Sequence, residues 1–199
     1  MPHTYARYDS LAANYDKVIQ PLERWFLNGL RKEAIASLPA GSRVLEIGAG
    51  TGQNFILYER NMHGVATEPS AEMLRIATNK ERPKDWNIVQ SCAEELPFKA
   101  QTFDGALATL VICSVKSPEQ VFAELRRVVR PGGTISLLEH VRPALPLGWF
   151  FDLLNVITVP LFDDHVNRRT VKLVSKAGFK VTKVRRLGLG IFNVITCVV

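Results

Sequence analysis

The stretch VLEIGAGTG, residues 44–52, places three glycines directly after a short strand-like run that contains one acid, Glu46. Glycine lacks a Cβ atom and accepts left-handed backbone conformations. Glycines at 48, 50 and 52 therefore let the chain turn sharply and let a ligand approach the backbone. The pattern predicts a ligand-binding loop at the end of a buried strand.

Strand-like and helix-like segments alternate along residues 21–141. Such an alternation predicts a parallel sheet covered by helices on both faces. Proline is tolerated in the first turn of a helix, so we expect a helix to begin at Pro21. Ser70 and Ser117 are expected helix N-caps. Strands are expected at residues 43–47, 63–68, 86–91, 102–111 and 134–141, and helices at 21–38, 52–60, 70–79 and 118–130.

The C-terminal part departs from this alternation. Residues 165–178 have helical spacing that ends at Gly178, and strand-like runs follow at 179–187 and 192–199. Gly188-Leu189-Gly190 joins the two runs, which predicts an antiparallel β-hairpin.

Three ligand classes compete for the glycine loop. A P-loop needs Lys and then Ser or Thr after its last glycine, and this chain has neither there. A dinucleotide loop is spaced G-x-G-x-x-G, whereas here the third glycine comes one residue early and Gln53 stands at the later position. S-Adenosylmethionine carries a cationic ammonium group, which the Glu46 carboxylate could bind. The alternative is that Glu46 accepts hydrogen bonds from the amides of the loop. Glu68, the last residue of the second expected strand, can accept hydrogen bonds from both hydroxyls of a ribose, which fits a dinucleotide equally well.

Six stretches carry a resemblance to a known family: VLEIGAGTGQNF, ATEPSAEML, AEELPF, FDGALATLVICSV, ELRRVVRPGG and LLEHV. With them the chain resembles the class I S-adenosylmethionine-dependent methyltransferases of the methyltransferase type 11 group. It is similar to bacterial phospholipid N-methyltransferases, quinone C-methyltransferases and methyltransferase-like thiol methyltransferases. The resemblance implies an α/β, Rossmann-like fold with a seven-stranded, mostly parallel sheet whose last strand is antiparallel. We expect one domain over 1–199, with an N-terminal helical lid at 1–40 and a substrate-cover helix at 144–165.

The resemblance also implies which residues contact the cofactor. Many relatives have an aspartate where Cys92 stands, and a thiol is a poorer acceptor for the adenine amino group. The implied contacts are Glu46, Gly48, Ala49, Gly50 and Gly52 for the methionine moiety, Glu68, Pro69 and Met73 for the ribose, Cys92, Ala93 and Glu94 for the adenine, and Thr109 and Leu110 beside the methyl group.

The acceptor site is expected to be apolar. Methyltransferases that act on nucleobases usually have Asn/Asp-Pro-Pro-aromatic after the fourth strand, where this chain has ATLVICSV, so we expect no nucleic-acid partner. Candidate acceptor-side residues are Tyr15 in the lid, His140 at the end of the fifth strand, and His165 and Arg168 at the start of the next helix. A histidine can act as a base near neutral pH, and Arg168 can hold a phosphate or carboxylate.

These residues together predict methyl transfer from S-adenosylmethionine, leaving S-adenosylhomocysteine, to a small amphipathic acceptor. A phospholipid amine head group is favoured, and a quinone carbon or a small thiol stays open. A non-catalytic S-adenosylmethionine-binding or lipid-surface module and a nicotinamide oxidoreductase are the alternatives from other classes. The cofactor carries the activated methyl group, so no obligatory catalytic triad is expected.

Charge and cysteine content bear on partners and location. The net charge is +6, and residues 141–199 carry nine basic and three acidic side chains. Arg24, Arg31 and Lys32 lie near Trp25 and Phe26 in the first expected helix, which suggests contact with an anionic membrane surface, a solvated face being the alternative. The three cysteines have no metal-binding spacing, so we expect no metal. With no signal peptide expected, the predicted location is cytoplasmic, peripheral at the inner face of a membrane.

Overall fold

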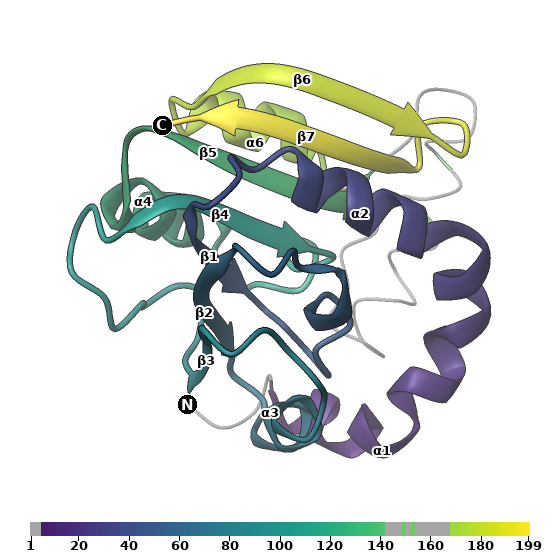
Figure 1. Cartoon of the computed structure of the whole chain (residues 1–199). Helices are drawn as coiled ribbons and strands as arrows, with labels where there is room; N and C mark the ends of the chain where they lie inside the picture. The colour runs from purple at the N-terminus through teal and green to yellow at the C-terminus, as the bar shows by residue number, and fades with distance from the viewer. Residues whose placement is uncertain (1–4, 142–148, 150–152, 154–167) are drawn as a thin grey trace.

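The computed structural model describes residues 5–141, 149, 153 and 168–199. Its strands form one seven-stranded sheet in the order β3-β2-β1-β4-β5-β7-β6 (Figure 1). β1 to β5 run parallel, and β7 runs antiparallel to β5 and β6, so the predicted mostly parallel sheet with a terminal hairpin is confirmed. The strands are β1 Arg43–Ile47, β2 His63–Glu68, β3 Trp86–Gln90, β4 Phe103–Thr109, β5 Val129–His140, β6 Lys180–Leu187 and β7 Phe192–Val198.

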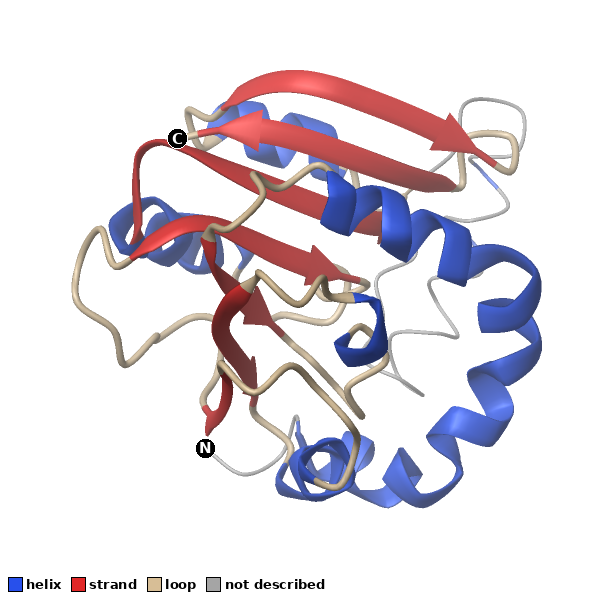
Figure 2. Ribbon diagram, viewed as in Figure 1, coloured by secondary structure: helices blue, strands red, loops and turns tan. Residues whose placement is uncertain are grey.

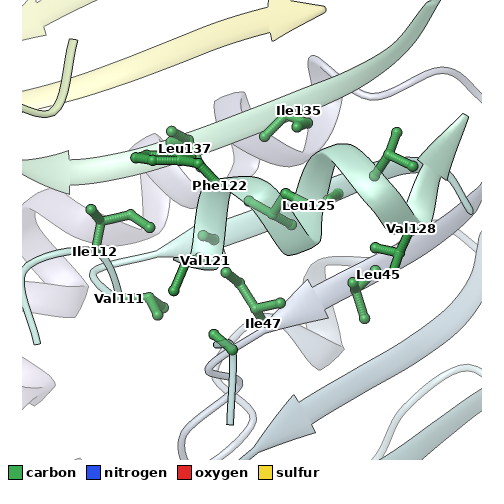
Figure 3. Close-up of a cluster of buried hydrophobic side chains, with 14 of the residues drawn as sticks. Leu45, Ile47, Val111, Ile112, Val121, Phe122, Leu125, Val128, Ile135 and Leu137 are labelled. Carbon is green, nitrogen blue, oxygen red and sulfur yellow. The ribbon is translucent and has the colours of Figure 1, made fainter. Parts of the chain in front are cut away.

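Helices flank both faces of the sheet, as Figure 2 shows, and both faces of its central strands β1 and β4 are buried. Leu45 and Ile47 of β1 point to one face, where they pack with Phe122 and Leu125 of α4 (Pro118–Val128; Figure 3). Val44 of the same strand points to the other face, where it joins the core that contains α2 (Asn28–Ala36). This alternation follows from the two-residue period of a strand. Because both faces are covered, β1 and β4 are buried along almost their whole length.

The expected helix N-caps are confirmed. The Ser70 hydroxyl accepts a hydrogen bond from the Met73 amide at 3.1 Å and starts α3 (Ala71–Thr78). The Ser117 hydroxyl accepts one from the Gln120 amide at 3.3 Å and starts α4. Each cap satisfies an amide that has no partner within its own helix.

The N-terminal helix begins well before Pro21, so that boundary was wrong. α1 spans Tyr5–Leu22, with Pro21 near its end, and leads directly into a π-helical turn, η1, at Glu23–Leu27 and then into α2. The amide of Asn28 donates to the carbonyl of Glu23, the five-residue spacing of a π-turn. Proline removes an amide donor, and a π-turn lets a helix continue past such a disturbance in its hydrogen bonding.

Three further boundaries differ from the sequence predictions. Only a short 3-10 helix, η2 (Phe55–Leu57), follows the glycine loop, because the chain becomes extended at Tyr58. β5 begins at Val129 rather than 134, with a register shift around Pro131 to Gly133. The helix expected from 165 is described as α6, Thr170–Lys176, and packs on the same face as α4.

The expected cover helix at 144–165 lies largely outside the described residues. Trp149 and Leu153 of that range are described, and both are helical and exposed. Within residues 5–141 and 168–199, no helix is long and apolar enough to cross a membrane.

A backbone contact within the sheet yields a stability prediction. A Cβ atom added at Gly64 of β2 would lie 2.0 Å from the carbonyl oxygen of Val44, so neighbouring strands would have to separate. We expect Gly64→Ala to lower the free energy of unfolding by about 3 kcal/mol or more in urea denaturation. Gly29→Ala is the matched control, because an added Cβ there meets nothing within 4 Å, and it should stabilise the protein by about 0.5–1 kcal/mol. Equal effects of the two substitutions would contradict the described packing of β1 on β2.

Candidate active site

A pocket lies at the carboxyl ends of β1, β2 and β4, beneath α1, where parallel α/β sheets bind their ligands. The described residues that line it are Tyr8, Tyr15, Arg31, Gly48, Ala49, Gly50, Thr51, Gln53, Glu68, Pro69, Met73, Ala93, Glu94, Thr109, Leu110, Val111, Ser114, Val115 and Lys116. Most of the predicted cofactor residues are among them. Glu46, Gly52, Cys92, His140 and Arg168 are predicted site residues that do not line it.

The three loop glycines have left-handed backbone conformations, with φ of +63° at Gly48, +56° at Gly50 and +80° at Gly52. A Cβ atom at Gly48 would lie 2.6 Å from the Val111 side chain, and one at Gly52 would lie 2.7 Å from the Phe55 ring. One at Gly50 would meet no protein atom within 4 Å. Gly48 and Gly52 are therefore needed for packing within the protein, whereas Gly50 leaves space that belongs to the pocket.

Glu68 ends β2 and holds the glycine loop in place. Its carboxylate accepts hydrogen bonds from the amides of Gly50 at 2.8 Å and Ser70 at 2.9 Å. Burial raises the pKa of the Glu68 carboxyl to about 7, although these two hydrogen bonds oppose the shift. An acid on the pocket wall can accept hydrogen bonds from hydroxyl groups of a ligand, which is the role predicted for Glu68 toward the ribose.

Glu46 is fully buried, and its oxygens accept hydrogen bonds from Asn54 Nδ2 at 2.7 Å and the Tyr58 hydroxyl at 2.8 Å. Burial raises the pKa of Glu46, while these bonds and the nearby Arg31 oppose the rise. The acid is thus satisfied by side chains rather than by the loop amides considered as its alternative partners. Its contact with a ligand ammonium stays a prediction.

Arg31 is the pocket residue that sequence reasoning misplaced. It was grouped with exposed basic residues of an amphipathic helix, but it is buried. Its Nη1 donates to Thr109 Oγ1 at 2.7 Å and to Asn54 Oδ1 at 3.1 Å, and Nη2 pairs with Glu23 at 2.6 Å. The signal was in its spacing, because residues 27, 30, 31 and 34 recur at the period of one helix face. Arg31 is therefore not part of a membrane-facing basic surface.

Strand β4 ends in a strained turn at the pocket. Leu110 has φ +60°, an uncommon conformation for a residue with a side chain, and its amide donates to the carbonyl of Leu138 at 2.7 Å. The next two amides, of Val111 and Ile112, both donate to Glu139 Oε1, at 3.0 and 2.9 Å. Glu139 was also missed by sequence reasoning, although it stands in the LLEHV motif. Its buried carboxylate shapes the loop that carries Thr109, Leu110 and Val111.

Helix α1 closes one side of the pocket with Tyr8 and Tyr15. Burial raises the pKa of Tyr15 to about 12, so its phenol stays protonated and is not a base near neutral pH. The adjacent Asp16 accepts hydrogen bonds from Thr51 Oγ1 at 2.5 Å, Gln53 Nε2 at 2.7 Å and Lys80 Nζ at 2.6 Å. Although burial opposes the shift, these contacts lower the pKa of Asp16. The Asn14-Tyr15-Asp16 motif thus attaches α1 to the glycine loop.

Only two of the three residues predicted to contact the adenine line the pocket. Ala93 and Glu94 line the pocket, and Glu94 accepts a hydrogen bond from the amide of Lys116 at 3.0 Å. Cys92 is half-buried outside the lining.

Two other acceptor-side candidates, His140 and Arg168, do not line the pocket. His140 ends β5 opposite Phe192 of β7. Arg168 donates from Nη1 to the carbonyl of Ile112 and from Nη2 to the carbonyl of Val115 at 2.7 Å, and so secures the loop after β4. Anion binding by Arg168 stays a prediction, and His165 lies outside the described residues. No cluster of three potential metal-ligating side chains is found in the described parts of the chain.

The raised pKa of Glu68 makes stability depend on pH. Unfolded Glu titrates near 4.5 and folded Glu68 at about 7, so the folded state binds the proton more tightly. Its contribution to stability is complete below about pH 4.5 and is lost as pH rises through about 7. Glu68→Gln cannot titrate, so its free energy of unfolding relative to wild type should rise between about pH 5 and 8, by a few kcal/mol at most.

Urea denaturation of the ligand-free protein at several pH values measures this difference. Glu124→Gln is the control, because hydrogen bonds from Arg127 lower the pKa of Glu124 and keep it ionised throughout that range. If the difference in free energy of unfolding between Glu68→Gln and wild type does not change from about pH 5 to 8, Glu68 is already ionised in the folded protein at about pH 5.

Comparison with known proteins agrees with this geometry. Residues 45–137 match the family described as "Methyltransferase domain". The chain is 31% identical over 144 residues to demethylmenaquinone methyltransferase of Renibacterium salmoninarum, which covers 69% of this chain and 59% of that one. It is 36% identical over 104 residues to phosphatidylethanolamine N-methyltransferase of Cereibacter sphaeroides, covering 50% and 51%. It is 34% identical over 114 residues to human thiol S-methyltransferase TMT1B, covering 54% and 46%.

The chain spans about half the length of these curated relatives. A solved structure from Thermotoga maritima, described as an S-adenosylmethionine-dependent methyltransferase and possible histamine N-methyltransferase, extends the likeness. It has a TM-score of 0.76 at 25% identity and covers 98% of this chain and 99% of its own. With the sheet order, the glycine loop and the family match in agreement, the chain belongs to the class I S-adenosylmethionine-dependent methyltransferases.

Proposed function

We propose that the protein transfers the methyl group of S-adenosylmethionine to a small amphipathic acceptor, with a phospholipid amine head group as the favoured choice. The observation that carries the proposal is the composition of one pocket. The glycine loop and Glu68 form its wall toward β1 and β2, whereas Leu110, Val111 and Val115 form an apolar wall after β4. A cofactor and a lipophilic acceptor can thus meet at Thr109 and Leu110, between the two walls.

S-Adenosylmethionine supplies an activated methyl group, so the residues of this chain have to bind, orient and exclude water. Glu68 would accept the ribose hydroxyls, and Gly50 leaves room for the ligand beside the backbone. Tyr8 and Tyr15 on α1 would close the pocket from solvent. Because Tyr15 stays protonated, the proposal assigns it hydrogen bonding to the acceptor rather than proton abstraction.

Arg31 is proposed to bind the carboxylate of the methionine moiety. Glu23 accepts hydrogen bonds from Nε and from one N–H of Nη2, while Asn54 and Thr109 accept those from the two N–H groups of Nη1. Among the described contacts this leaves one Nη2 proton for a ligand in the pocket that Arg31 lines. A guanidinium is well suited to a carboxylate partner.

The acceptor class follows from the apolar wall and from the relatives. The relatives act on phosphatidylethanolamine, a demethylated menaquinone or a thiol, as their names say, and identities near one third do not separate these acceptors. The highest identity among them, 36%, supports the phospholipid amine. A quinone carbon and a small thiol are the alternatives, and a non-catalytic S-adenosylmethionine-binding module is the alternative from another class.

An acceptor screen with labelled methyl donor tests this function. Phosphatidylethanolamine vesicles, a demethylated quinone and a small alkyl thiol are supplied separately, and S-adenosylhomocysteine release is measured beside label transfer. We expect label in the lipid and loss of transfer in Glu68→Ala. Transfer to the quinone or thiol alone would replace the favoured acceptor. Tight cofactor binding without transfer to any of the three would favour the non-catalytic module.

The role of Arg31 is tested with a paired substitution. Arg31→Met alone leaves the Glu23 carboxylate without its cation, so Arg31→Met/Glu23→Gln is used to limit the loss of stability. We expect the double variant to bind S-adenosylmethionine about tenfold more weakly or worse in calorimetry, because a hydrogen bond to a charged group contributes roughly 1.5–3 kcal/mol. Lys32→Met, at the adjacent exposed position, is the control and should leave affinity unchanged. Wild-type affinity in a folded double variant would remove Arg31 from the cofactor site.

A further inference from the structure

Five large apolar side chains are exposed on the segment from Val18 to Phe26 and on the C-terminal hairpin. Val18, Leu22, Trp25 and Phe26 are 77%, 39%, 80% and 49% exposed, and Leu189 is 85% exposed. The first four recur at intervals of four, three and one residues, so they share one side of the helix. We call these five residues the apolar face.

The two parts of the apolar face lie side by side. A Cβ atom at Gly188 would lie 3.9 Å from the Phe26 ring, and the Phe26 and Phe192 ring centroids are 6.3 Å apart. Figure 1 shows the β6–β7 turn near the bend where α1 leads into α2. The apolar face is therefore one surface made by segments far apart in the sequence.

Leu189 occupies a backbone conformation that disfavours it. Its φ is +58°, in the left-handed region that glycine or asparagine adopts more readily. An apolar side chain at this exposed turn thus brings conformational strain and little burial within the chain. Contact with a partner outside the fold would account for an apolar side chain at this position.

The charges around the apolar face are predominantly positive. Lys17, Arg24 and Arg186 are exposed on the same elements. Three acids of these elements are held by cations of the protein: Asp16 pairs with Lys80, Glu23 with Arg31, and Glu33 with Lys183 and Arg185. A fourth acid, Asp9 of α1, accepts hydrogen bonds from the Ser70 hydroxyl and the Glu72 amide. An apolar centre with a basic rim matches the interface of an anionic bilayer, where aromatic and aliphatic groups insert and cations meet lipid phosphates.

We infer that the apolar face docks the protein on an anionic membrane surface. The same helices supply Tyr15 and Arg31 to the pocket, so docking would hold the lid side of the pocket against the lipid. Docking on a membrane is measured without methyl transfer. Failure to dock would therefore be distinguishable from failure of the proposed reaction.

The first test measures co-sedimentation of the full chain with vesicles of phosphatidylcholine alone or mixed with phosphatidylglycerol. We expect binding to the mixed vesicles and weak binding to the neutral ones. Arg24→Glu/Arg186→Glu should reduce binding to mixed vesicles about tenfold or more, since each basic residue contributes about a fivefold effect. Lys172→Glu/Lys176→Glu on α6, which packs on the opposite face of the sheet from α2, is the matched charge control and should have a smaller effect. Equal losses for both pairs, or no binding to either vesicle, would overturn the inference.

The second test separates docking from folding. Leu189→Asn relieves the turn conformation, so the melting temperature should stay the same or rise while vesicle binding falls. Trp25→Ala should likewise weaken vesicle binding and leave the melting temperature nearly unchanged, because its side chain is mostly exposed. Unchanged vesicle binding in both variants would overturn the inference. So would a dimer in solution that Trp25→Ala dissociates, which would assign the apolar face to a second copy of the chain.

Discussion

A buried guanidinium, that of Arg31, connects the N-terminal helices to the carboxyl edge of the sheet. It joins Glu23 of η1 to Thr109 at the end of β4 and to Asn54 after the glycine loop. Asn54 continues the chain of contacts to Glu46 of β1. Burying these charges is costly, and an apolar cluster of similar volume would give comparable stability. What the polar contacts add is geometry, because each hydrogen bond fixes the direction of its partner. The π-turn that contains Glu23 belongs to this arrangement, since it presents the acid to Arg31 about two turns later in the helix.

Two other carboxylates hold the loops of the pocket in place, as Arg31 holds the N-terminal helices. Glu68 receives the amides of Gly50 and Ser70, and Glu139 receives those of Val111 and Ile112. Each acid stands at or near the end of its strand and accepts hydrogen bonds from two backbone amides. Glu68 lies on one side of the pocket, and Glu139 lies on the other. The pocket is thus shaped by acids on neighbouring parts of the sheet edge. Because the amides belong to backbone, the loops keep their form while the lining side chains can vary.

The elements that the sequence predicted well are those whose signals are local. Strands β1, β2 and β4 were anticipated within about two residues because both of their faces are buried. The two serine caps were found because a cap needs only the next three residues. The misplaced parts depend on distant partners. η2 is short because Asn54 and Tyr58 are committed to Glu46, and Arg31 is buried because Glu23, Asn54 and Thr109 surround it. No property of a single helix shows such contacts, although the position of Arg31 on the buried stripe was a usable sign.

The acids of the pocket also bear on the direction of ligand exchange. In the ligand-free protein burial raises the pKa of Glu68 to about 7, and the nearby Glu46 and Asp9 carboxylates add to the rise. A cation entering the pocket offsets these contributions, since an opposite charge favours the ionised carboxylate. S-Adenosylmethionine has a sulfonium charge that is lost when its methyl group leaves, so the product is the less cationic of the two ligands. Ionised carboxylates in and beside the pocket would therefore favour the methyl donor over the product. At high pH the burial of ionised Glu68 lowers the stability of the ligand-free protein. The same buried carboxylate would favour the cationic cofactor over its product.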